Sequence, residues 1–137
     1  MIEVNNLTTF AVDKRLIQRV VRKVLKSEKK KISELSVAFV GTAKIKELNK
    51  KYRGKNQVTD ILSFDLSSKN NQVSGEVVIC PIVVKKNAKK FGLSFKNELR
   101  RILIHGILHL LGYDHEKSKK EARKMEKKQE YYLIGTA

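Results

Sequence analysis

The three histidines of the chain all lie in one short segment, His105 to His115, which reads HGILHLLGYDH. His105 and His109 are four residues apart, so on a helix they share a face and can direct their imidazole nitrogens at one cation. Gly112 permits the left-handed turn that ends such a helix, so that His115 can supply a third nitrogen. Three imidazoles with a fourth position open are typical of catalytic zinc, whereas structural zinc usually has four protein ligands. The spacing predicts a zinc site at the end of a helix.

The same spacing occurs in zinc proteases of the pattern His-Glu-x-x-His-x-x-Gly-x-x-His, with one difference. The glutamate that serves those enzymes as general base is replaced here by Gly106. Because glycine offers no side-chain proton acceptor, ordinary peptidase chemistry loses its base while the ligand set remains. An amide hydrolase that uses another base is a minor alternative. A single histidine on an apolar helix face is usually a core residue, but three at this spacing favour a metal site.

The net charge points to a polyanionic partner. The chain has 30 Lys and Arg against 14 Asp and Glu, a net charge of +16. The basic residues cluster in segments 14–31, 44–55, 85–101 and 117–128. Any one cluster can be a solvated helix face, but four together favour nucleic acid. Zinc can activate water and polarise a phosphoryl oxygen, so the residues predict a metal-dependent hydrolase of nucleic acid without indicating which kind.

Length and composition limit the class of protein. A chain of 137 residues is the size of one domain, and we expect a single domain over residues 1–137. The longest nearly apolar stretch, Ile102–Gly112, is far shorter than the ~20 residues of a membrane span. The first six residues have neither a basic nor an apolar leader, and the single cysteine, Cys80, excludes an internal disulfide. We therefore expect a cytoplasmic protein with no membrane partner.

The hydrophobic periodicity predicts an α+β fold with about four strands in a small mixed sheet and about five helices, and a metal site on a helix-turn. Strands are expected at 2–4, 35–40, 59–64 and 76–80. Helices are expected from Asp13 as N-cap, then at 42–53, 81–91, 95–111 and 119–133. The third and fourth strands are expected to form a hairpin with its turn at 67–71. In the second helix we expect Ile45, Leu48 and Tyr52 to face inward.

Several segments resemble the YbeY family of bacterial endoribonucleases. The histidine segment 105–115 closely resembles the signature of that family. Residues 48–55, with the following Thr-Asp-Ile-Leu-Ser-Phe at 59–64, resemble its central motif. Residues 75–80 resemble its next strand, and the acidic and apolar pattern of 121–130 resembles its last helix.

The resemblance implies a zinc-dependent, single-strand-specific endoribonuclease. Its expected roles are maturation of ribosomal RNA, notably the 3′ end of the small-subunit RNA, and ribosome quality control. The implied partners are single-stranded RNA and the small ribosomal subunit, with no DNA. It also implies zinc ligation by His105, His109 and His115, with His105 and Arg53 as catalytic residues and Arg53 in contact with the substrate. From the residues alone, the preferred explanation of Arg53 is a cation that interacts with the dipole at a helix C-terminus.

Alternatives stay open for the function of the protein and for the roles of two aspartates. The protein could be a non-catalytic, basic ribosome-assembly factor in which the metal is structural. Asp60 could orient a ligand or cap a turn, and Asp114 could bond a histidine ring or shape the turn that precedes His115.

Overall fold

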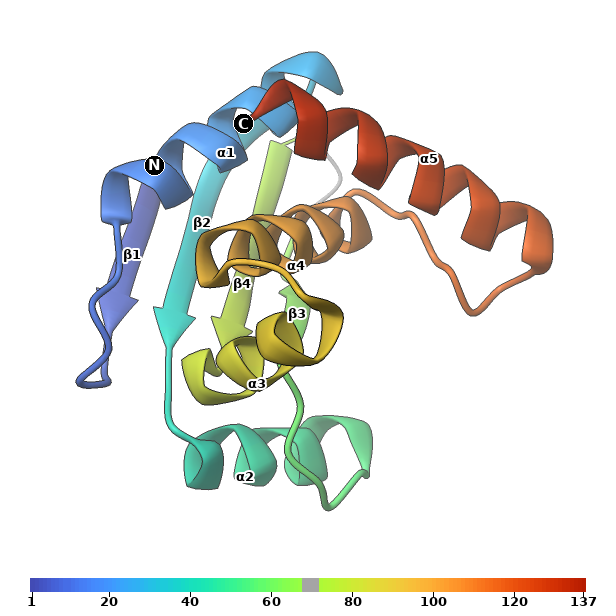
Figure 1. Cartoon of the computed structure of the whole chain (residues 1–137). Coiled ribbons are helices and arrows are strands. Elements are labelled where there is room, and N and C mark those ends of the chain that lie inside the picture. The colour runs from blue at the N-terminus through green and yellow to red at the C-terminus, as the bar shows by residue number, and fades with distance from the viewer. Residues whose placement is uncertain (68–71) are drawn as a thin grey trace.

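The computed structural model describes residues 1–67 and 72–137 of the chain (Figure 1). In that part of the chain the strands are β1 (Ile2–Asn6), β2 (Lys31–Phe39), β3 (Ile61–Asp65) and β4 (Gln72–Ile79). The helices are α1 (Lys14–Ser27), α2 (Thr42–Arg53), α3 (Pro81–Phe91), α4 (Phe95–Leu110) and α5 (Lys119–Gly135). The predicted α+β fold is confirmed.

The four strands form one mixed sheet in the order β1-β2-β4-β3. β1, β2 and β4 run parallel, and β3 pairs with β4 in the antiparallel direction. The predicted hairpin of the third and fourth strands is therefore confirmed, while most of its predicted turn, at 67–71, lies outside the described residues. β3 is an edge strand, and this edge faces the functional site described below.

Helix ends follow the capping residues that the sequence predicts. The side chains of Asp13, Ser94 and Ser118 each accept a hydrogen bond from a backbone N–H in the first turn of α1, α4 and α5. Pro81 occupies the first turn of α3, where its missing N–H has no intrahelical partner. Gly54 ends α2 in the left-handed conformation, with φ of 69°.

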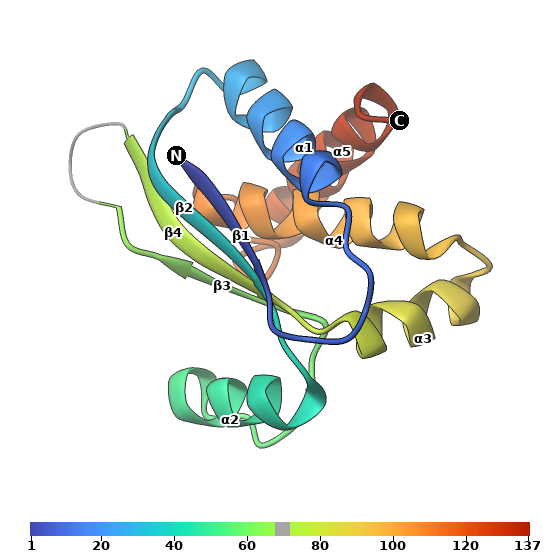
Figure 2. The same cartoon turned by 90° about the vertical axis from the view of Figure 1, so that its left-hand side faces the viewer.

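The sheet buries its two faces unequally. The main core joins one face of the sheet to α1 and α4, which lie together on that side (Figure 2). A smaller core under α2 is formed by Val40, Ile45, Leu62, Val78 and Cys80. α4 is the central helix, because it contacts α1, α3, α5 and β3. The helix that carries two of the histidines is thus fixed from several sides.

Three details differ from the sequence-based expectations. β4 begins at Gln72 rather than at residue 76. β2 begins at Lys31 rather than at residue 35, because an irregularity in its pairing between Ile32 and Glu34 breaks the apolar alternation that would reveal a strand. Tyr52 does not face inward: its side chain is 56% exposed. The small core contacts α2 through Ile45, which is fully buried, and through Leu48, so the last turn of the helix projects beyond it.

Among residues 1–67 and 72–137, no helix has the length and apolar character needed to cross a membrane.

Candidate functional site

The three histidines come together at the end of α4. His105 and His109 lie one turn apart on α4, and His115 lies in the loop that leads to α5. Gly112 takes a φ of 97° and turns the chain back toward the helix. The ring centres are 5.1 Å apart for His105 and His115, 6.1 Å for His109 and His115, and 6.4 Å for His105 and His109. The rings therefore form a compact triangle.

The triangle is slightly wider than a closed zinc site. With Zn–N bonds of ~2.1 Å and tetrahedral angles, ligating imidazole centres lie about 5 Å apart. The His105–His115 pair meets this value, but His109 lies about 1 Å farther from both partners. In the described ranges no three His, Cys, Asp or Glu side chains are already arranged to hold a metal ion. His109 is exposed, and the three side chains fit a metal by residue type and by their common position at the end of α4.

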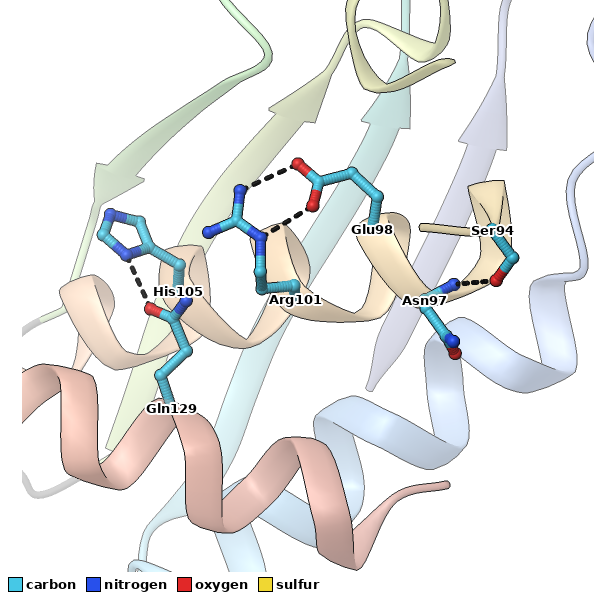
Figure 3. A network of polar contacts seen from close by, with 6 residues as sticks. All are labelled: Ser94, Asn97, Glu98, Arg101, His105 and Gln129. Carbon is cyan, nitrogen blue, oxygen red and sulfur yellow. Dashed lines mark hydrogen bonds and ion pairs between the residues drawn. The ribbon is translucent and has the colours of Figure 1, made fainter. Parts of the chain in front are cut away.

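His105 is held by a partner on another helix. Its Nδ1 lies 2.9 Å from Oε1 of Gln129 on α5 (Figure 3). Because the amide oxygen accepts, Nδ1 carries the proton and Nε2 keeps its lone pair for a ligand. Burial lowers the pKa of His105 below its ordinary value, and the other two imidazoles lower it further, against opposing effects of Gln129 and Asp60. Burial and the two neighbouring imidazoles therefore favour the neutral form of His105, which is the form that binds a metal.

Arg101 stands one turn before His105 on the same face of α4 (Figure 3). Its Nε and Nη2 donate to the two carboxylate oxygens of Glu98 at 2.6 and 2.8 Å. The Glu98 side chain is fully buried, whereas that of Arg101 is one-third exposed. This bidentate bond fixes the guanidinium beside the histidines. The sequence analysis did not single out Arg101, although the four-residue steps from Arg101 to His105 and His109 could have indicated it.

Arg53 approaches the histidines from the opposite side. It is the last residue of α2, and its Nη2 donates to the backbone oxygen of Ser63 on β3 at 2.5 Å. Its guanidinium also lies 5.6 Å from the ring centre of Phe64. A groove of about 470 Å³ lies between α2, β3 and α4, and it is lined by Arg53, Lys55, Arg101 and the three histidines. The structure therefore brings all the predicted site residues to one groove.

Gly106 packs tightly against the edge strand. A Cβ atom at this position would lie 2.6 Å from Cδ1 of Ile61 and 3.0 Å from Oγ of Ser63. The Ser63 hydroxyl donates to the backbone oxygen of Gly106 at 3.2 Å. The position that carries the general base in zinc proteases thus faces β3 in this fold, and a glutamate there would have to displace the side chains of Ile61 and Ser63. The absence of the protease base has a structural cause.

The two aspartates near the site differ in role. Oδ1 of Asp114 accepts from the backbone N–H of Glu116 at 2.9 Å, so this carboxylate shapes the turn before His115. Asp60 lines the groove, and its charge raises the pKa values of both His105 and Arg101. Asp60 therefore acts on the site through its charge.

Comparisons with known proteins show the family to which the chain belongs. A family model described as Endoribonuclease YbeY matches residues 3–136. A protein of that name from Thermodesulfovibrio yellowstonii is 48% identical, with 85% of this chain and 82% of the relative covered. One from Thermotoga maritima is 40% identical, with 87% and 79% covered. The solution structure of TM1509 from Thermotoga maritima matches 99% of this chain and 89% of its own, with a TM-score of 0.70 and 32% identity. The chain belongs to the YbeY family of endoribonucleases.

Proposed function

We propose that the protein is a zinc-dependent endoribonuclease that cleaves single-stranded RNA. The observation that carries the proposal is the gathering of three imidazoles beside a groove that also holds the guanidinium groups of Arg53 and Arg101. A ligand set and fixed cations in one groove suit phosphodiester hydrolysis, whose transition state gains negative charge. The relatives named endoribonuclease support RNA, not DNA, as the substrate.

His105, His109 and His115 would hold the zinc ion. When bound, such an ion activates water at neutral pH and polarises a phosphoryl oxygen. Gln129 keeps the lone pair of His105 Nε2 directed into the groove, because it occupies Nδ1. His105 therefore defines the fixed corner of the site, while the exposed His109 completes it.

Arg53 would stabilise the charge that develops on the phosphate. One of its N–H groups is used by the Ser63 carbonyl, which leaves the rest of the guanidinium fork for a phosphate oxygen. Arg101 would contribute a second fixed positive group across the groove, since Glu98 uses only one edge of its guanidinium.

The biological substrate that we infer is ribosomal RNA in the cytoplasm. The expected task is maturation of the 3′ end of the small-subunit RNA, with a part in ribosome quality control and the small ribosomal subunit as partner. The net charge of +16 supports a large polyanionic partner, because phosphate contacts release counterions. Affinity for RNA should therefore fall steeply between ~50 and ~200 mM salt.

A second candidate function is a basic assembly factor in which the metal is structural. One observation favours it: His115 lies in the loop after α4, so a metal ion shared with His105 and His109 would tie that loop to the helix. In that case His115→Ala should unfold the loop or weaken RNA binding. In the catalytic case the same variant should bind RNA with near-normal affinity and lose turnover.

The two functions are separated by assaying His109→Ala and His115→Ala together. Cleavage of a single-stranded RNA and affinity for the same RNA are measured at one salt concentration, with and without chelator. The enzyme proposal expects both variants to keep affinity and lose cleavage. Metal-dependent cleavage by His109→Ala at the parent rate would refute it.

A further inference from the structure

A second groove continues from the candidate site along the edge of the sheet. It has a volume of about 590 Å³ and lies between the last turn of α2, strands β3 and β4, and the end of α4. Arg53, Ser63 and His109 line both this groove and the histidine groove. An RNA strand whose phosphate lies at the histidines therefore has its neighbouring nucleotide within reach of the second groove.

The second groove presents an exposed aromatic ring. Tyr52 is 56% exposed, and its ring meets that of Phe64 edge to face, with 5.3 Å between ring centres. Leu66 on the same wall is 66% exposed. Phe64, in turn, is flanked by the guanidinium of Arg53. An exposed tyrosine with its ring supported on one edge by a second aromatic ring is a ready platform for stacking.

The charges in this groove change sign along its length. Arg53 lies where this groove joins the histidine groove, whereas Asp65 and Glu76 line the rest of it. Carboxylates repel phosphate but accept hydrogen bonds from the N–H groups of a nucleobase. In a chain of net charge +16, two carboxylates at one end of an RNA groove orient a nucleotide with its phosphate toward Arg53 and its base toward Glu76.

We propose that the second groove is a nucleobase subsite, in which an unpaired base next to the scissile phosphate stacks on Tyr52 and directs its N–H groups at Glu76. This proposal rests on the proposed function, because it assumes RNA at the histidines. It gives the protein a physical means to distinguish single strands from duplex: a paired base has its N–H groups occupied and its faces stacked within the helix.

The experiment uses binding, so that it does not depend on cleavage. Affinities of the chelator-treated protein are measured for a short single-stranded RNA and for its blunt-ended duplex at equal salt. Tyr52→Ala and Tyr52→Leu should each bind the single strand about tenfold more weakly and leave duplex affinity unchanged. Tyr131→Ala is the matched control, since Tyr131 is 67% exposed on α5. It should change neither affinity. Unchanged duplex binding also shows that each variant is folded.

A spectroscopic readout identifies the stacking residue. The chain contains 4 tyrosines and no tryptophan, so tyrosine emission is observed without interference. Binding of the single strand should quench part of this emission. Tyr52→Phe should keep the affinity, because the ring remains, but lose the quenching. Quenching that persists in Tyr52→Phe would overturn the proposal.

The binding results separate this proposal from the proposed function. The nucleobase-subsite proposal is wrong if Tyr52→Ala and Tyr52→Leu bind the single strand as tightly as the parent does. It is also wrong if they lose affinity for the single strand and for the duplex to the same extent. Metal-dependent cleavage by the parent protein would then still support the nuclease. A parent protein that, with its metal bound, neither binds nor cleaves RNA would overturn both proposals.

Discussion

The two sides of the histidine site are built differently. The held side comprises Glu98, Arg101, His105 and Gln129, where each side chain is held by another side chain and Glu98 is fully buried. The open side comprises Arg53, His109 and His115, all of which are exposed. Under the proposed function the two sides would divide the work: the held side would fix where a metal ion and a phosphate lie, and the open side would adjust to them.

The largest effect on folding stability is expected from the held side. Glu98→Ala leaves the guanidinium of Arg101 without its partner and opens a cavity in a fully buried position. Because Arg101 is one-third exposed, we expect the lower end of the range for a broken buried pair, about 3 kcal/mol of unfolding free energy. Urea denaturation measures this loss. The double variant Glu98→Leu with Arg101→Met is the control and should recover most of the lost unfolding free energy. A Glu98→Ala protein as stable as the parent would contradict the distinction between the held side and the open side.

A smaller loss is expected from Gly106→Ala, which tests how closely α4 sits on β3. The added Cβ would meet Cδ1 of Ile61 at 2.6 Å and Oγ of Ser63 at 3.0 Å. Both atoms belong to side chains, so the strain can relax in part, and we expect about 1–2 kcal/mol of destabilisation from overpacking. Thermal unfolding measures it. Gly41→Ala is the matched control, because a Cβ there meets no atom within 4 Å. Equal melting temperatures for the two variants would show that the packing is looser than described.

Glu28 supports the site from farther away. Its carboxylate accepts from the hydroxyls of Tyr113 and Tyr132 and from Lys128, which joins the end of α1 to the loop before His115 and to α5. Burial alone would raise the pKa of Glu28, but these hydrogen bonds and the charge of Lys128 outweigh it and lower the pKa below its ordinary value of 4.5. The ionised carboxylate therefore stabilises the fold.

Glu28→Gln should lower the unfolding free energy by about 1 kcal/mol at pH 7. Because the folded-state pKa is the lower one, this stabilisation is fully present above pH 4.5 and disappears as the pH falls through the folded-state value. Urea denaturation of the parent and the variant at pH 7, 5 and 3 tests whether their difference in unfolding free energy shrinks toward acid pH. A stability difference that grows toward acid pH would contradict it.

The smallest effect on stability is expected on the open side. Arg53→Gln removes an exposed cation whose one backbone contact is the Ser63 carbonyl, so unfolding free energy should change by no more than about 0.5 kcal/mol. RNA cleavage should nevertheless fall by about a hundredfold, as expected for the loss of a transition-state contact. Arg123→Gln on α5 is a charge-matched control that should change neither the unfolding free energy nor the rate of RNA cleavage. Strong destabilisation by Arg53→Gln would place Arg53 on the held side and break the comparison.

The sequence predicted the features of the molecule that depend on near neighbours along the chain. The caps at Asp13, Ser94 and Ser118 and the one-turn spacing of His105 and His109 are local patterns, and the structure has them as expected. These patterns fix helix ends and the face on which a side chain lies, so they could be read without knowledge of the packing.

Features that depend on tertiary packing could not be predicted in this way. Gln129 meets His105 across 24 positions of sequence, and only the docking of α5 on α4 makes the contact. Glu98 is a glutamate in the first turn of a helix, an ordinary surface position, until the packing around α4 buries it. Tyr52 has the helical spacing of a core residue, yet the small core under α2 ends before it.

The most direct test of the central claim is the zinc content of the purified protein, measured by elemental analysis alongside cleavage of a single-stranded RNA. We predict a single zinc ion per chain, loss of both zinc and cleavage after chelation, and recovery of both when zinc is added back. His105→Ala should hold no zinc and cleave no RNA. A chelated, zinc-free protein that cleaves RNA at the full rate would contradict the account.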